Sequence, residues 1–219
     1  MSVPESWTRI VSWCHEHVPA TADAILPPAG TTALRDAEAA TSGPWPDDLR
    51  SWYALADGTE RTPAGYVLPF HRPLPLAEVV SEWSMWQDIE RVRSAVPRDP
   101  GADARLRALG GVPEERSDVV GQSESEPAGT PARAFLKSFV PIAEDQAGAY
   151  LFVDTRPGPL HGCVTEFVSG DADVSGPLWP SVEAMLSDVA DALHLDRPVC
   201  GRLPVVFDGE LDWDFAADE

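Results

Sequence analysis

The stretch FVPIAEDQAGAYLFVDTRPGPLHGCVTEFV, residues 139–168, decides the fold class. It contains three short runs rich in β-branched and aromatic residues, separated by Gly, Pro, Asp and Gln. Short runs of this composition with turn residues between them are typical of consecutive antiparallel strands. We therefore predict strands over residues 139–142, 150–153 and 163–168.

Helical patterns lie on both sides of these strands. Apolar residues recur at helical spacing over residues 7–18, 49–56 and 76–83. A weaker pattern over residues 34–38, capped by Thr31 or Thr32, predicts a short helix that ends before Ser42. After the strands, Ser181 is placed to cap a helix, and Asp208-Gly209 between two apolar runs predicts a terminal hairpin. Together these patterns predict an α+β fold, a single domain over residues 1–219 with an antiparallel or mixed sheet packed against helices.

Two further segments carry expectations about local structure. The run GYVLPF, residues 65–70, reads as another strand. Residues 87–134 are rich in proline, glycine, serine and mixed charge. Because such composition is typical of segments that do not form a packed core, we expect a mobile insertion within the domain.

The charge is strongly acidic. The chain has 36 acidic and 16 basic side chains, a net charge of −20, and 16 of the acids lie within residues 135–219. Such a surface repels nucleic acid and anionic lipid, so we expect direct binding to neither. Solubility alone also accounts for acidity.

The sequence has three cysteines without paired spacing, a start without a signal-peptide pattern and no long apolar run. These features indicate a cytoplasmic protein.

Motifs for catalysis and metal binding are absent from the sequence. It has no phosphate-binding loop, dinucleotide-binding glycine motif, nucleophile elbow or HExxH motif. Cys14 and His17 have a spacing that a metal site could use, but Cys14 belongs to the apolar stripe of its helix, which favours a buried thiol. We therefore predict no catalytic residues, no metal and no cofactor, and a protein that is not an enzyme.

Three segments taken together resemble the SUKH superfamily, which includes the Smi/Knr cell-wall regulators. They are WPDDLRSWYALADG at 45–58, the stretch at 139–164, and the helix that begins at Ser181. Most matching positions have a structural meaning as turn glycines, strand ends or helix starts. The residues that match the family pattern are Glu38, Pro46, Leu49, Asp57, Gly58, Pro141, Gly148, Asp154 and Gly162. Gln146-Ala147 and the length of the insertion depart from the pattern.

The resemblance implies a non-catalytic protein-binding module. Bacterial members are thought to neutralise secreted toxins, often nucleases, and the acidic charge suits a basic toxin of that kind. The alternative that the resemblance implies is an intracellular regulatory or scaffold protein acting on cell-wall or envelope synthesis. We predict partner contact where two turns with family-like residues converge, at Asp57, Glu144, Asp145 and Asp154. The sequence leaves the oligomeric state open.

Overall fold

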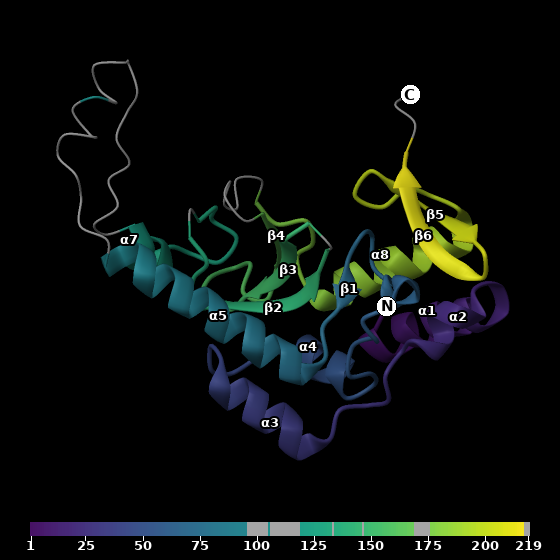
Figure 1. Ribbon diagram of the computed structural model, residues 1–219, viewed down its shortest axis with the longest axis horizontal. Helices are drawn as coiled ribbons and strands as arrows, with labels where there is room; N and C mark the ends of the chain where they lie inside the picture. Colours follow the sequence, from purple (N-terminus) through teal and green to yellow (C-terminus); the bar gives the residue numbers. More distant parts are fainter. Residues whose placement is uncertain (96–104, 106–118, 133, 146, 169–175, 217–219) are drawn as a thin grey trace.

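The computed structural model describes residues 1–95, 105, 119–132, 134–145, 147–168 and 176–216. Within these residues, helices pack against a four-stranded sheet, and a separate two-stranded hairpin lies near the C-terminus (Figure 1). The α+β class predicted from the sequence is confirmed.

The main sheet has the order β1-β2-β3-β4, and all neighbouring strands are antiparallel. Its strands are β1 (Arg72–Pro73), β2 (Phe139–Glu144), β3 (Ala149–Asp154) and β4 (Val164–Val168). The three strands predicted from residues 139–168 are therefore confirmed. Every residue of β3 is buried, and the rings of Phe139 and Phe152 stack across β2 and β3 with centroids 3.9 Å apart. This pairing places the core against the centre of the sheet.

The helices form two groups around the sheet. In the first, α1 (Val3–His17) packs against α8 (Val182–Leu195) and α4 (Asp47–Tyr53), with the short α2 (Pro19–Asp23) beside it. In the second, α5 (Leu76–Ala95) runs along β2 and contacts α3 (Thr31–Ala40), as Figure 1 shows. The predicted cap of α8 is present, because the Ser181 Oγ accepts a hydrogen bond from Ala184 N at 3.0 Å.

The C-terminal hairpin consists of β5 (Arg202–Phe207) and β6 (Glu210–Phe215). Asp208 and Gly209 at its turn have φ of +50° and +80°, as the predicted two-residue turn requires. Trp213 is buried between exposed Asp212 and Asp214, the alternation of a strand with one buried face. The Trp213 Nε1 donates to Tyr66 O at 3.3 Å, so the hairpin is held against the segment after α4.

The strand predicted over residues 65–70 is wrong. Pro63–Gly65 forms a turn of 3-10 helix, and Leu68 and His71 then exchange backbone hydrogen bonds of 3.2 and 3.1 Å across a tight reversal. Pro69 has no N–H to give to a ladder, and Phe70 adopts φ of +56° within this reversal. The segment is therefore a turn, and strand pairing begins only at Arg72.

The predicted insertion is shorter in the structure at both ends. Helix α5 continues to Ala95, and α7 (Val119–Ser125) lies inside the predicted range. The ring of Trp86 stacks on Phe135 with centroids 5.4 Å apart, and Gln87 Nε2 donates to Leu136 O at 3.4 Å. These contacts hold the residues that flank the predicted range, together with its first residue, against the core. Its expected mobility falls on residues 96–104 and 106–118, which lie outside the described residues.

Candidate functional site

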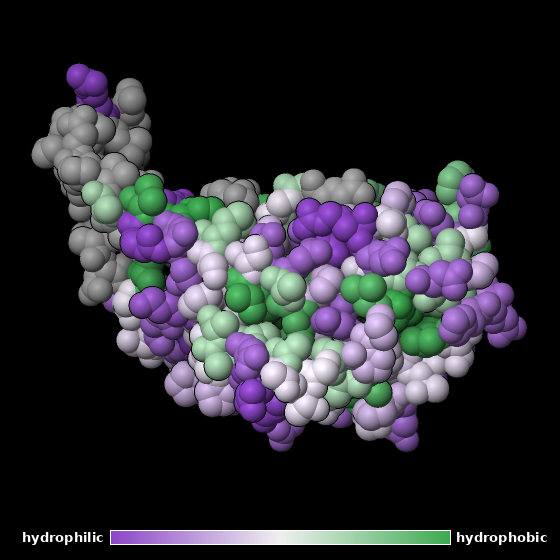
Figure 2. All heavy atoms as spheres, turned by 60° about the horizontal axis from the view of Figure 1, so that its bottom comes forward, coloured by the Kyte–Doolittle hydropathy of each residue, from purple (hydrophilic) through white to green (hydrophobic). Residues whose placement is uncertain are grey.

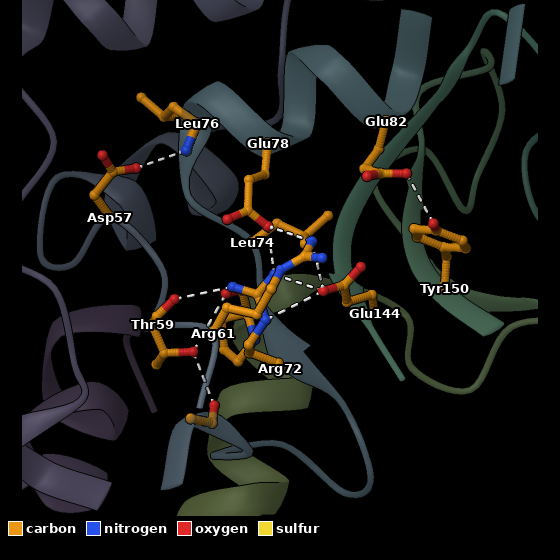
Figure 3. Close-up of polar contacts among 12 residues, drawn as sticks. Asp57, Thr59, Arg61, Arg72, Leu74, Leu76, Glu78, Glu82, Glu144 and Tyr150 are labelled. Carbon is orange, nitrogen blue, oxygen red and sulfur yellow. Dashed lines mark hydrogen bonds and ion pairs between the residues drawn. The ribbon is translucent and has the colours of Figure 1, made fainter. Parts of the chain in front are cut away.

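A cluster of two arginines and two glutamates lies at the β1 edge of the sheet (Figure 3). We call Arg61, Arg72, Glu78 and Glu144 the arginine–glutamate cluster. Arg72 comes from β1, Glu144 from the paired end of β2, and Glu78 from the first turn of α5. Strand pairing and the start of α5 therefore bring these charges together.

Arg72 is the buried centre of this cluster. Its side chain is 1% exposed, and its Nε and Nη2 donate to Glu144 Oε1 at 3.2 and 2.6 Å. Its Nη1 donates to Thr59 O at 3.0 Å, and its Nη2 also donates to Glu78. A buried cation without such acceptors costs several kcal/mol. The acceptors from three segments make this burial possible.

Arg61 closes the cluster from the solvent side. Its side chain is 64% exposed, and its Nη2 lies 3.1 Å from Glu78 Oε2 and 3.0 Å from Glu144 Oε1. Burial disfavours the charged form of Glu78, but the hydrogen bonds from Arg72 and Arg61 outweigh it and lower the pKa of this carboxyl. The two arginines neutralise the two glutamates, and their ion pairs join β1 and β2 of the sheet to the first turn of α5.

The turn after α4 positions Thr59 and the start of α5. Asp57 Oδ1 accepts a hydrogen bond from Leu76 N at 2.7 Å, which satisfies an N–H at the first residue of α5. Gly58 has φ of +71°, and a Cβ at this position would lie 2.5 Å from the carbonyl carbon of Leu74. Asp57 and Gly58 therefore let the chain reverse closely against the segment that leads into α5.

The structure places Glu144 and Asp145 at one end of the sheet and Asp57 beside the first residue of α5. Figure 3 shows Glu144 beside the buried Arg72 and Asp57 farther away, bonded to Leu76, and Asp145 directly follows Glu144. Asp145 Oδ1 accepts hydrogen bonds from Ala147 N and Ala149 N at 2.8 and 2.7 Å, so this carboxylate also orders its own turn. Contact of these residues with a partner stays a prediction.

Asp154 does not join them, and its predicted place at the converging turns is wrong. In the sheet register, Glu144 pairs with Tyr150 whereas Asp154 pairs with Phe139, so Asp154 lies at the other end of β3. Its side chain is buried and forms an ion pair of 2.6 Å with Arg156, and it accepts from Gly129 N at 2.8 Å. Asp154 thus neutralises a buried arginine instead of facing solvent.

The remaining family-pattern residues hold the loops around α4 and the sheet. Glu38 Oε1 accepts from Trp45 N at 2.7 Å and from Arg50 at 2.6 Å, which joins α3 to α4. A Cβ on Gly162 would lie 3.1 Å from Pro46 Cγ, so these two positions touch. Of the others, Leu49 is fully buried, Pro141 borders a register shift between β2 and β3, and Gly148 has φ of +95°.

A second site is a pocket of about 540 Å³ between the reversal at 68–71, β4 and the C-terminal hairpin. Sequence reasoning missed it, because its walls come from several segments far apart in the chain. Its polar groups include His71, Glu166, Cys200 and Arg202. Burial raises the pKa of the Cys200 thiol to about 11, so this thiol is protonated at neutral pH and is a weak nucleophile.

Metal-ligating groups do not gather among the described residues: none of their His, Cys, Asp and Glu side chains forms a set of three or more that could hold an ion. Cys14 lies in the core, and burial raises its pKa to about 12, whereas His15 and His17 are exposed.

Among the helices that the structure describes, none is long and apolar enough to cross a membrane. On the face in Figure 2, hydrophobic residues form small groups separated by hydrophilic ones.

Comparison with known proteins gives a consistent result. The model of a family described as the SMI1 / KNR4 family (SUKH-1) matches residues 28–188, which include the arginine–glutamate cluster but not the C-terminal hairpin. A Yarrowia lipolytica protein named "KNR4/SMI1 homolog" is 27% identical over 182 residues, covering 72% of this chain and 25% of that protein. A Neurospora crassa protein named "Glucan synthesis regulatory protein" is 25% identical over 169 residues, covering 72% and 32% respectively. The chain thus spans between a quarter and a third of the length of these relatives.

Proposed function

The chain belongs to the SMI1/KNR4 family (SUKH-1), and on this premise we propose that it is a non-catalytic regulatory protein that binds a protein partner in cell-wall or envelope synthesis. The observation that carries this proposal is the similarity to a glucan synthesis regulatory protein over 72% of the chain. The cytoplasm is the compartment in which we propose that it acts.

The ion pairs and the exposed aromatic side chains of the described residues support protein binding as the activity of this chain. The arginine–glutamate cluster is an ion-pair network that joins sheet to helix, and its carboxylates are occupied by arginines. By contrast, the C-terminal hairpin presents Phe207 and Phe215 to solvent, with exposed fractions of 73% and 71%. Exposed aromatic residues are common anchors of protein interfaces.

Neutralisation of a toxin is a second candidate, and the charge distribution favours it. The net charge is −20, and residues 135–219 hold 16 of the 36 acidic side chains. A nuclease toxin needs a basic surface to hold phosphate, so an acidic protein could be steered to that surface and occlude it. In both candidates the partner is a protein, and neither requires binding to nucleic acid or membrane.

Affinity purification of the tagged full-length chain from its source organism tests both candidates. Washes at low and high salt, followed by mass spectrometry, would identify partners and show whether charge holds them. Recovery of envelope-synthesis proteins supports the regulatory role, whereas a basic toxin lost at high salt supports neutralisation. Disruption of the gene with a measurement of wall polysaccharide is the independent test, and an unchanged wall would count against regulation.

A further inference from the structure

The pocket beside the C-terminal hairpin contains a buried hydrogen-bond acceptor without a donor. The His71 side chain is 6% exposed, and its Nδ1 lies 2.7 Å from the carbonyl oxygen of Pro69. A carbonyl can only accept, so Nδ1 carries the proton of the neutral ring. The Nε2 is then an acceptor, and no group in the described residues donates to it.

A second acceptor faces this nitrogen. Glu166 Oε1 lies 3.4 Å from His71 Nε2, and the Glu166 side chain is 42% exposed, so it connects the buried ring to solvent. Burial lowers the pKa of His71, although the Pro69 carbonyl and the Glu166 and Asp145 charges act in the opposite direction. At neutral pH the ring does not supply a second proton, and the two acceptors can share an N–H donor from outside.

The charge of the pocket selects the kind of donor. Four carboxylates line it, those of Asp145, Glu166, Glu210 and Asp212, against the single guanidinium of Arg202. The Arg202 guanidinium lies on the rings of Phe70 and Phe215, 3.8 and 3.5 Å from their centroids, and makes no ion pair within the described part of the chain. The lining is therefore negative and partly aromatic, which favours a cation.

We propose that this pocket receives an arginine or lysine side chain of a basic partner protein, whose N–H groups donate to His71 Nε2 and Glu166 together. The inference rests on the proposed function, binding of a protein, and adds the chemistry of the partner. Val206 and Phe207 on the hairpin are 54% and 73% exposed, and Phe207 lines the pocket. Phe207 therefore provides an apolar side chain at the rim of the pocket, and exposed aromatic side chains of this kind are common at binding hot spots.

The first test uses a blocked tripeptide, acetyl-Gly-Arg-Gly-amide, added to the isotope-labelled full-length protein. Amide chemical shifts should change around residues 71, 166, 202 and 213, and the His71 ring Nε2 signal should move. The same peptide with citrulline is matched in shape but uncharged, and it should bind at least about tenfold more weakly because the charge-assisted hydrogen bond to Glu166 is lost. Equal binding of the two peptides would overturn the proposal.

Three variants sharpen this test. Glu166→Gln should weaken binding of the arginine peptide about tenfold, whereas Glu16→Gln, the same change on the exposed surface of α1, should not affect it. Arg202→Gln removes a like charge from the lining and should strengthen the binding about twofold to fivefold. If acetyl-Gly-Glu-Gly-amide bound instead and Arg202→Gln abolished its binding, the pocket would be an anion site and the proposal would be wrong.

The pH dependence gives another readout. Protonated Nε2 is a donor and repels a cation, so affinity for the arginine peptide should fall as pH falls through the pKa of His71. The charged groups facing this ring are Glu166, Asp145 and Arg202. In Glu166→Gln, binding should be weaker and its remaining pH dependence should follow the His71 ring signal. Affinity that stays constant while the ring titrates would contradict a direct contact with Nε2.

Failure of this inference and failure of the proposed function give different results. If Glu166→Gln and the unaltered protein recovered the same envelope partner equally, the pocket assignment would fall while the regulatory role stood. If the arginine peptide bound as expected but gene disruption left the wall unchanged, the regulatory role would fall while the pocket chemistry stood.

Discussion

Arg72 carries a full charge at a site 1% exposed, so its replacement should be costly. Arg72→Met keeps much of the side-chain volume but removes every donor that Glu144 and Thr59 receive from the guanidinium. Removing one partner of a buried ion pair typically costs about 3–5 kcal/mol. We expect the free energy of unfolding, measured by urea denaturation, to fall by about this amount.

Arg61→Met is the matched control within the same cluster. Arg61 binds the same two carboxylates, but its side chain is 64% exposed, so water replaces its contacts. Exposed ion pairs contribute no more than about 1 kcal/mol. If both substitutions destabilised the protein equally, burial of Arg72 would not be the source of its importance.

The lowered pKa of Glu78 predicts that the folded protein loses part of its stability in acid. The pKa of this carboxyl is lowered in the folded protein from its ordinary value of 4.5. A group with a lowered folded pKa stabilises the fold above its unfolded pKa, and this contribution is lost as pH falls through the folded pKa. We therefore expect the unaltered protein to exceed Glu78→Gln in stability at pH 6, and the difference to shrink steadily below about pH 4.5.

Urea denaturation of both proteins across this pH range measures that difference. Other carboxylates titrate in both proteins and cancel in the comparison. A difference independent of pH would mean that the ionised form of Glu78 is not the form that stabilises the fold.

The turn between α4 and α5 depends on Gly58 for two separable reasons. Its φ of +71° is unfavourable for other residues, and a Cβ would meet the Leu74 backbone at 2.5 Å. Gly209 in the hairpin turn has φ of +80°, but a Cβ there would have no neighbouring atom within 4 Å, so Gly209→Ala isolates the cost of φ alone. That cost is about 1–3 kcal/mol.

Gly58→Ala should therefore destabilise the protein more than Gly209→Ala in thermal unfolding, because the turn must open to relieve the contact. The Asp57 hydrogen bond to Leu76 N should weaken with it, since both belong to the same reversal. Equal losses in the two variants would indicate that the Leu74 segment yields without cost.

Elements with a complete local signal could be predicted from the sequence. The strands within 139–168 have turn residues at each end, and Asp208-Gly209 specifies its hairpin without help from the rest of the chain. Residues 65–70 have strand-like composition, but a reversal stabilised by Leu68 and His71 prevails there. The polar composition of residues 87–95 gave no sequence signal for the last turns of α5. The stack of Trp86 on Phe135, a tertiary contact, holds the helix where this segment begins.

The candidate sites were only partly predictable because they depend on assembly. The sequence predicted that two turns bring Asp57, Glu144, Asp145 and Asp154 together, but the position of Asp154 depends on the register of β2 with β3. Arg72 as the buried partner of Glu144 has no sequence signal, since arginine is normally exposed. The pocket combines residues as distant as His71, Glu166 and Arg202, so only the folded chain reveals it.

The net charge of −20 acts on the whole fold. Repulsion among like charges opposes the compact state. Local pairs such as Arg9–Asp191 and Arg197–Asp188 are partly exposed, with nitrogen–oxygen distances of 2.7 and 2.6 Å, and each is worth no more than about 1 kcal/mol. Added salt weakens both effects, but the repulsion extends over many more charges than the pairs do.

We therefore expect sodium chloride to stabilise this protein at pH 7. Raising its concentration from about 20 mM to about 300 mM shortens the screening length from roughly 20 Å to below 10 Å. A gain on the order of 1 kcal/mol corresponds to a rise in Tm of roughly 2–4 °C for a chain of this size. Near pH 4.4, where the net charge approaches zero, the rise should disappear because little net repulsion remains to be screened. Potassium chloride at equal ionic strength should act alike, whereas a Tm that falls with salt at pH 7 would mean that the ion pairs outweigh the net repulsion.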